Sequence, residues 1–310
     1  MDYVTLGRTG LKVSVAGLGC GGPSRLGMRD GKSEEECAGI IRRAFDLGVN
    51  FLDTAEVYGT EPVIGRALAA LPREKIVIST KKKFPLDNPK DPANETRRSL
   101  EQSLRLMRTD YIDVYHIHGV EPQEYDYAVA NVLPVLVKLR EEGKIRFIAI
   151  SEAFVEDMTH AMLARALPEN HWDVVMAGFN ILNQTARREV FPRTIAAGVG
   201  TLVMFAVRRA FSQPKRLREV CADLKRRGLI ESADDDPLGF LLKEGGAASY
   251  VEAAYRFCRH EPGAHVILTG TGSAEHLRQN IESINKPPLP EEVAKRLREI
   301  FARVDCVTGN

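Results

Sequence analysis

Short apolar runs rich in β-branched residues alternate with amphipathic stretches along almost the whole chain. The apolar runs, which predict strands, cover residues 15–19, 50–54, 76–80, 112–117, 147–150, 173–177, 201–205 and 265–269. The amphipathic stretches, which predict helices, cover residues 33–47, 61–71, 94–107, 128–142, 155–166, 185–197, 247–259 and 274–284. Eight strands alternating with eight helices predict an α/β fold of the (β/α)₈ TIM barrel type.

Three segments lie outside this alternation. Residues 3–6 and 11–13 flank the turn sequence Gly7-Arg8-Thr9-Gly10, which predicts a β-hairpin before the first barrel strand. Residues 206–246 form a long polar excursion with one helix at 215–226, and residues 290–304 predict a last surface helix. The chain shows no linker or low-complexity tract, so we expect residues 1–310 to form one domain.

One string favours a different α/β architecture, the doubly wound sheet. Residues 17–22 read GLGCGG, which matches the GxGxxG pattern of dinucleotide-binding loops. That fingerprint requires a helix to begin directly at the glycines. Here Pro23, Ser24 and a polar loop precede the helix expected near Ser33, so the barrel remains the better prediction.

Composition excludes several classes of partner. The 43 Lys and Arg residues nearly balance 42 Asp and Glu residues, which argues against nucleic-acid binding. The first residues do not resemble a secretory signal, and no apolar run is long enough to span a membrane. The five cysteines are scattered and form no CxxC pair, which predicts reduced thiols in a cytoplasmic protein and no metal site.

The chemistry-bearing residues follow three consecutive predicted strands. Asp53 ends the second strand, Lys81 follows the third and His118 follows the fourth, while Tyr58 lies in the loop after Asp53. The carboxyl ends of barrel strands share one rim, where active sites are built. Taken singly, each residue has an ordinary structural interpretation as a turn acid, a loop aromatic, a solvated charge or a core histidine. Together they predict one site.

The four residue types suit carbonyl chemistry. A lysine beside Tyr58 would lower the pKa of the phenol from about 10, and Asp53 would orient that lysine. The tyrosine then serves as a general acid, and a neutral His118 donates a hydrogen bond to a carbonyl oxygen. None of the four is primed for acyl transfer, so a bound cofactor must supply the difficult step, and hydride transfer fits.

Five segments carry a resemblance to a known family. GRTGLKVSVAGLGCGG, NFLDTAEVYG, IVISTK, SLRLMRTDYIDVYHIH and GKIRFIAIS are similar to successive signatures of the aldo-keto reductases. The resemblance implies a barrel whose bottom is plugged by the N-terminal hairpin, with NAD(P)H bound without a doubly wound sheet. It implies reduction of an aldehyde or ketone to an alcohol. Tyr58 would be the proton donor, Lys81 and Asp53 would tune it, and His118 would orient the carbonyl.

The resemblance also assigns cofactor contacts, with departures that indicate a divergent member. Contacts on the nicotinamide side are Gly19, Cys20, Asp53, Ser151, Glu152, Phe205 and, toward the pyrophosphate, Arg208. Glu152 stands where the family usually has Asn, and Met176 where it has Gln. A shift of one residue would put Met204, rather than Phe205, against the nicotinamide ring.

The adenosine side of the cofactor is assigned around the eighth strand. Gly270, Thr271 and Gly272 precede a helix whose N-terminus can receive a phosphate, and His276, Gln279 and Asn280 follow on one helical face. We expect NADPH as the cofactor, with NADH also possible because the loop is neutral.

The leading hypothesis is therefore an NAD(P)-dependent carbonyl reductase or alcohol dehydrogenase that acts on a small carbonyl compound. One alternative is a cofactor-binding regulatory or sensor subunit with little turnover, and another is a lyase or isomerase that uses Lys81 as a Schiff-base amine. The loops at residues 23–30, 119–127 and 206–213 are expected to form the pocket walls, with apolar surface from Tyr125, Tyr127 and Phe211.

Overall fold

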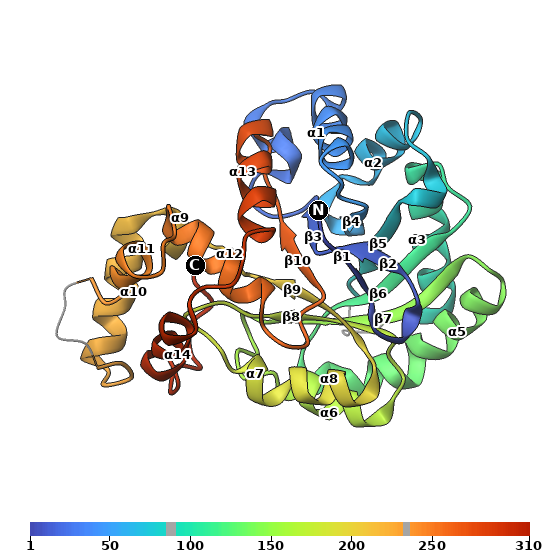
Figure 1. Cartoon of the computed structure of the whole chain (residues 1–310). Coiled ribbons are helices and arrows are strands. Elements are labelled where there is room, and N and C mark those ends of the chain that lie inside the picture. Colours follow the sequence, from blue (N-terminus) through green and yellow to red (C-terminus); the bar gives the residue numbers. More distant parts are fainter. Residues whose placement is uncertain (85–90, 232–235) are drawn as a thin grey trace.

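Eight parallel strands close into a barrel in the computed structural model, which describes residues 1–84, 91–231 and 236–310. Figure 1 shows the helices packed around this barrel. The strands are β3 (Ala16–Gly19), β4 (Phe51–Asp53), β5 (Val77–Lys82), β6 (Ile112–Val120), β7 (Ile145–Glu152), β8 (Val174–Gly178), β9 (Gly200–Met204) and β10 (Val266–Thr269). Each strand pairs with its neighbour in sequence, and β10 pairs with both β9 and β3. The predicted barrel is confirmed.

The expected helices are present, together with three short ones that the sequence did not predict, at residues 125–127, 209–212 and 240–243. They are α1 (Glu34–Asp46), α2 (Glu61–Leu68), α3 (Pro92–Met107), α4 (Tyr125–Tyr127), α5 (Leu133–Glu141), α6 (Ala161–Ala166), α7 (Ala186–Glu189), α8 (Phe191–Ala197), α9 (Arg209–Ser212), α10 (Pro214–Arg226), α11 (Phe240–Lys243), α12 (Tyr250–Arg259), α13 (Ala274–Ile284) and α14 (Glu291–Ile300). In the described ranges, no helix is both long and apolar enough to cross a membrane.

Several predicted helices are shorter than their patterns suggested, and the backbone explains two of these differences. The helix expected at 155–166 begins only at Ala161, because His160 has a left-handed backbone (φ 64°) that no α-helix continues through. The Asp157 carboxylate accepts hydrogen bonds from the amides of Ala161 and Met162 and so caps the new start. The helix expected at 185–197 divides at Val190, since Pro192, the second residue of α8, has no amide proton to continue the hydrogen bonds of α7.

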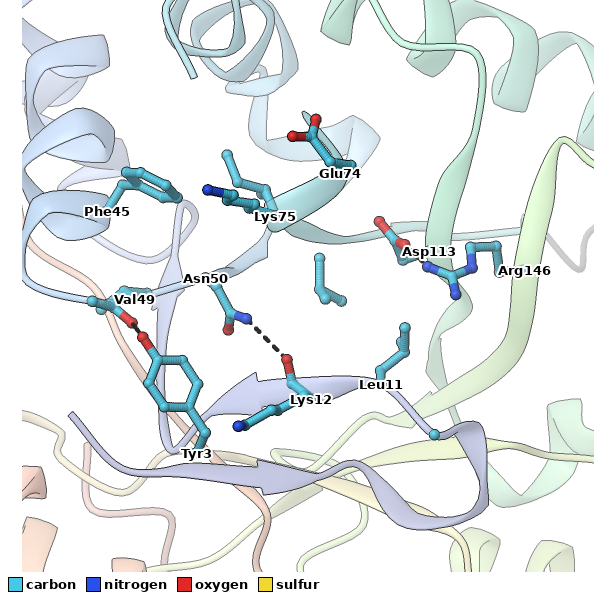
Figure 2. A pocket seen from close by; sticks show the side chains of 14 residues that line it. Tyr3, Leu11, Lys12, Phe45, Val49, Asn50, Glu74, Lys75, Asp113 and Arg146 are labelled. Carbon is cyan, nitrogen blue, oxygen red and sulfur yellow. Dashed lines mark hydrogen bonds and ion pairs between the residues drawn. The ribbon is translucent and has the colours of Figure 1, made fainter. Parts of the chain in front are cut away.

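The N-terminal hairpin closes the amino-terminal end of the barrel, as expected. Strands β1 (Tyr3–Thr5) and β2 (Lys12–Ser14) pair antiparallel. Leu6, Leu11 and Val13 are buried in one cluster with the apolar side chains of the barrel interior. At Gly7 (φ 48°) a Cβ atom would lie 2.4 Å from the Gly200 nitrogen, so only glycine permits this approach. A cavity of about 520 Å³ remains beside the hairpin, below the first residues of β4, β5 and β6 (Figure 2).

A buried carboxylate ties three neighbouring segments together at this end. Asp113 on β6 accepts hydrogen bonds from Arg73 (2.8 Å), from the backbone amide of Ile78 (2.9 Å) and from Arg146 (2.7 Å). Its side chain is 1 % exposed, so both oxygens depend on these donors. The side chain therefore links the segment before β5 to β6 and β7.

We predict that Asp113→Asn lowers the free energy of unfolding by about 3 kcal/mol, because two arginines lose a buried anionic partner. The matched control is Asp126→Asn, which breaks the ion pair of a 77 % exposed aspartate with Arg165 and should cost less than about 1 kcal/mol. Urea denaturation followed by circular dichroism measures both values. Equal losses in the two variants would contradict the role assigned to Asp113.

Candidate active site

The four predicted site residues lie together at the carboxyl-terminal rim. Asp53 is the last residue of β4, Lys81 lies on β5 and His118 lies on β6. Tyr58 ends a short 3₁₀ turn (Glu56–Tyr58) that follows β4. The register aligns Asp53 with Ser79 and Lys81 with His116, so these side chains point into the barrel from adjacent strands.

A buried ion pair forms the base of the site. The Lys81 ammonium donates to both carboxylate oxygens of Asp53 at 2.7 Å and to the Thr54 carbonyl oxygen at 2.7 Å. The three bonds use all three donors of the lysine. The side chains of Lys81 and Asp53 are 2 % and 6 % exposed, so each charge is held in place by the other.

A hydrogen-bonded chain extends this pair one layer deeper. The Ser79 hydroxyl donates to Asp53 Oδ1 (2.9 Å) and lies 3.1 Å from His116 Nε2. Because the hydroxyl has a single proton, its second bond must be donated by His116, which fixes the proton of this histidine on Nε2. Burial and the Lys81 charge hold the pKa of His116 well below its usual range, so the ring is neutral. The buried position of His116 below the ion pair gives it a structural role.

Tyr58 lies above the ion pair and against His118. Its hydroxyl is 3.4 Å from His118 Nε2, the two rings meet edge to face, and Lys81 Nζ lies 5.5 Å from the phenol ring centre. The Tyr58 ring occupies the space where a Cβ on Gly21 would lie, at 2.4–2.8 Å. The glycine-rich string therefore makes room for a side chain of the site and does not open a helix.

Two pKa values define the protonation of this cluster. Burial raises the pKa of Tyr58 above 10, and the opposing effect of Lys81 is smaller. The expected net lowering of this pKa by Lys81 is thus wrong for the structure. Burial, followed by the Lys81 charge, lowers the pKa of His118 to about 3, so the imidazole is neutral at physiological pH as expected. The site holds a protonated phenol beside a neutral imidazole.

The predicted contacts on the nicotinamide side lie on β3, β7 and the end of β9. Gly19 is half-buried, whereas the Cys20 side chain is fully buried and burial raises the pKa of its thiol. The Ser151 hydroxyl oxygen accepts a hydrogen bond from the Gly119 amide (2.8 Å). Met176 packs in the apolar barrel interior. Gly19, Cys20 and Ser151 remain predictions for cofactor contact, whereas Met176 was expected only to replace the usual Gln.

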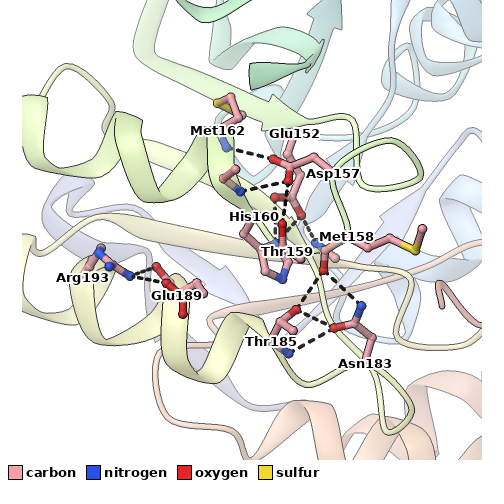
Figure 3. A network of polar contacts seen from close by, with 12 residues as sticks. Glu152, Asp157, Met158, Thr159, His160, Met162, Asn183, Thr185, Glu189 and Arg193 are labelled. Carbon is pink, nitrogen blue, oxygen red and sulfur yellow. Dashed lines mark hydrogen bonds and ion pairs between the residues drawn. The ribbon is translucent and has the colours of Figure 1, made fainter. Parts of the chain in front are cut away.

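Glu152 is part of a polar network that the sequence did not reveal (Figure 3). Its carboxylate oxygens accept from His160 Nδ1 at 2.8 and 2.9 Å, and Oε1 also accepts from the Gly178 amide at 2.7 Å. Glu152 and His160 are both fully enclosed, and burial raises the pKa of the glutamate. Both carboxylate oxygens already accept hydrogen bonds from protein donors. A nicotinamide carboxamide that binds Glu152, as predicted, would have to compete with these donors.

Phe205 follows β9 in a left-handed conformation (φ 65°) that bulky residues rarely adopt. The edge-to-face contact with Phe154 (5.3 Å between ring centres) supports one side of its ring, and the Arg208 guanidinium lies 4.3 Å from the ring centre. Arg208 Nε donates to Asn310 Oδ1 (2.8 Å), and the Ala210 amide donates to the Gly309 oxygen. Residues 309–310 thus hold this loop in place, a contact that no local sequence pattern predicted.

The predicted adenosine-side residues surround the start of α13. Ser273 caps this helix by accepting a hydrogen bond from the His276 amide, and Thr271 accepts one from the Ser273 amide. His276 and Gln279 are exposed, whereas Asn280 donates to Thr269 Oγ1 (2.9 Å).

Glycine is required beside this helix start for close packing. A Cβ on Gly270 would lie 2.7 Å from the Gly19 oxygen, and one on Gly272 would lie 2.6 Å from the Gly27 backbone.

The expected pocket walls need one correction. Tyr125 and Phe211 are buried, and the Tyr125 hydroxyl contacts Glu169 and Trp172 on the side of α6 and β8, so neither residue supplies open apolar surface. Tyr127 is partly exposed. Over residues 1–84, 91–231 and 236–310, no group of three or more His, Cys, Asp or Glu side chains is arranged to hold a metal ion.

Known proteins match both the sequence and the fold. The model of the aldo/keto reductase family matches residues 17–302. L-galactose dehydrogenase of Arabidopsis thaliana is 33 % identical over 296 residues, which cover 92 % of this chain and 89 % of that protein. A probable aldo-keto reductase of Glycine max is 30 % identical over 318 residues, covering 97 % and 88 % of the two chains.

Two solved structures share the barrel. A thermostable aldo-keto reductase in complex with the inhibitor epalrestat superposes with a TM-score of 0.72 at 26 % identity, covering 97 % of this chain and 100 % of the other. The holo form of an aldo-keto reductase from Bacillus halodurans also gives 0.72, at 23 % identity and with 99 % and 98 % coverage.

We predict that His118→Asn flattens the acid side of the stability profile. The folded-state pKa of about 3 lies below the unfolded value of 6.5, so the unfolded chain binds the extra proton and stability falls as pH drops between these values. This single group contributes a slope of up to about 1 kcal/mol per pH unit, which the variant loses. Urea unfolding at a series of pH values measures the slope; identical slopes in the two proteins would contradict the burial of a neutral ring.

Proposed function

This chain belongs to the aldo/keto reductase family, whose members are NAD(P)-dependent oxidoreductases, and we propose that it reduces an aldehyde or ketone to an alcohol with Tyr58 as the proton donor. The proposal rests on one observation above all. A protonated phenol and a neutral imidazole lie 3.4 Å apart over a buried Lys81–Asp53 pair at the rim of the barrel. That cluster donates two hydrogen bonds to one oxygen without offering a nucleophile.

The nicotinamide, when bound, supplies a hydride. The residues of this chain do the rest. Tyr58 holds the proton on its hydroxyl until the developing alkoxide takes it, because burial keeps the phenol protonated. His118 orients the carbonyl oxygen through Nε2, and Lys81 places a positive charge 5.5 Å from the phenol ring, where it stabilises the phenolate left behind. Asp53 and Thr54 hold the Lys81 ammonium at that distance.

The rim fits a nicotinamide dinucleotide. Gly19 is partly exposed and Gly270 is exposed, and neither carries a side chain, so a flat group can approach the backbone on this part of the rim. Phe205 offers a partly exposed aromatic ring one strand away, and the α13 N-terminus begins at Ser273. We assign these residues to the cofactor, with NADPH as the first choice and NADH as an allowed second. Glu152 is engaged elsewhere, which leaves Ser151 as the side chain nearest in sequence for the carboxamide.

The substrate proposal covers small carbonyl compounds and the corresponding alcohols. One relative is named for L-galactose, so this sugar belongs in any panel tested in the oxidative direction. The cytoplasmic location expected from cysteine usage is kept as part of the proposal; all five cysteines are free thiols.

We predict that Tyr58→Phe lowers kcat for aldehyde reduction about a hundredfold or more, because the variant lacks the phenol hydroxyl that would donate the proton. The NADPH dissociation constant should stay unchanged. Steady-state NADPH oxidation and isothermal titration measure the two quantities.

The matched control is Tyr111→Phe, which removes a hydroxyl from a tyrosine that stacks on Arg73 at the other end of the barrel. It should retain wild-type kcat. Full activity in Tyr58→Phe would overturn the assigned proton donor. Tight NADPH binding with no turnover of any aldehyde by the wild type would favour the regulatory-subunit alternative instead.

We also predict a flat pH profile. Because the pKa of His118 is about 3 and that of Tyr58 is raised above 10, neither group titrates between about pH 5 and pH 9. The kcat/KM for reduction should therefore be constant over this range and fall only above about pH 10, when the phenol loses its proton. Stopped-flow hydride transfer at each pH separates this effect from cofactor release. A loss of rate near neutrality would show that Tyr58 titrates there.

A further inference from the structure

Two arginines at the mouth of the site lack an acidic partner. Arg208 follows β9, and Arg25 starts the 3₁₀ segment after β3 (Arg25–Asp30). Both are partly buried, yet no carboxylate in the described ranges lies within ion-pair distance of either. Other partly buried arginines of this chain do have one: Arg73 pairs with Asp113 at 2.8 Å, and Arg187 pairs with Glu261 at 2.9 Å.

Neutral contacts hold both cations in place. Arg208 lies on the Phe205 ring and donates through Nε to Asn310, while no hydrogen bond from its terminal Nη atoms is found among the described residues. Arg25 makes one long contact, 3.5 Å from Nη2 to the Val57 oxygen, beside Tyr58. A fork of unpaired guanidinium donors is the geometry that binds a carboxylate or phosphate in a bidentate manner.

The acids of this rim cannot neutralise the arginines because they are engaged elsewhere. Asp53 binds Lys81, and Glu152 binds His160. Glu56 binds Lys82 at 3.0 Å. Arg208 and Arg25 nevertheless act on the reacting centre, since the positive charge of each lowers the pKa of Tyr58 against the effect of burial. These two effects on the pKa of Tyr58 are smaller than those of burial, Lys81 and Asp53.

We propose that Arg208 and Arg25 select a carbonyl substrate that carries an anionic group, a carboxylate or a phosphate, at its distal end. The proposal rests on the reductase function argued above and adds a substrate class to it. The competing source of the same oxyanion chemistry is the cofactor pyrophosphate, which the sequence resemblance assigned to Arg208. Proximity to Tyr58, where the carbonyl is reduced, favours the substrate for both arginines.

The test compares 4-carboxybenzaldehyde with methyl 4-formylbenzoate, its neutral ester, under NADPH. The ester group withdraws electrons at least as strongly as the carboxylate, so intrinsic reactivity does not favour the acid. Wild type should prefer the acid by about tenfold or more in kcat/KM, and this preference should shrink with rising salt. Arg208→Gln and Arg25→Gln should each lose most of this preference, so that the ratio of kcat/KM for the acid to kcat/KM for the ester falls toward one.

Arg29→Gln and Arg209→Gln are the matched controls, because both arginines are exposed neighbours that carry the same charge. They should keep the preference for the acid. Free benzoate should compete with the ester in wild type and lose potency in Arg208→Gln. This inhibition gives a second readout besides turnover.

Three outcomes would overturn the proposal. One is equal turnover of acid and ester by wild type, which leaves the reductase function intact. Another is an Arg208→Gln variant that keeps the preference but binds NADPH about tenfold more weakly, which assigns the cation to the pyrophosphate. The third is an equal loss in the control variants, which reduces the effect to net charge. Absence of turnover with every aldehyde would instead refute the proposed function itself.

Discussion

The buried pair of Lys81 and Asp53 is the constraint on which the site depends. Two charges withdrawn from water are tolerated only when every donor and acceptor is satisfied, and here Thr54, Ser79 and, through Ser79, His116 complete the set. These partners come from three adjacent strands. The register that aligns Asp53 with Ser79 and Lys81 with His116 is therefore fixed by the chemistry as well as by the apolar interior, since a slip of one residue would turn each side chain outward.

The same pair sets the protonation of the groups above it. Lys81 and burial both lower the pKa of His118. For Tyr58 the two effects oppose each other, and burial is the larger, so the pKa of the phenol is raised. A neutral imidazole beside a protonated phenol follows, and both can donate to a single oxygen. Arg208 and Arg25, like Lys81, lower the pKa of Tyr58. An anion bound to the two arginines would offset their charge and so raise the pKa of Tyr58.

Sequence patterns predicted those site residues that lie at or near the carboxyl end of a strand. Asp53, Lys81 and His118 could be placed on one rim because period-two apolar runs located the strands and barrel topology aligned their ends. The other residues of the site could not be placed. The bond between Glu152 and His160 depends on a left-handed residue that interrupts an apparently helical stretch, and the bracing of Arg208 by Asn310 joins positions about a hundred residues apart. Such contacts leave no local pattern, because tertiary packing overrides the local preference.

Glu152, which stands where the family usually has Asn, can have a role in the site without contacting a ligand. Its carboxylate holds the Gly178 amide at the end of β8, and the Phe154 ring lies where a Gly178 side chain would be. Phe154 stacks on His160 and contacts the edge of Phe205. A chain of contacts therefore runs from the Glu152–His160 pair through the Phe154 ring to Phe205, whose backbone is left-handed. An amide at position 152 would have only one acceptor oxygen for His160 and Gly178. The acidic residue instead serves both donors. The aromatic ring of Phe205 is therefore positioned from behind by a buried hydrogen-bonded pair, and Tyr58 is supported from below by a buried ion pair.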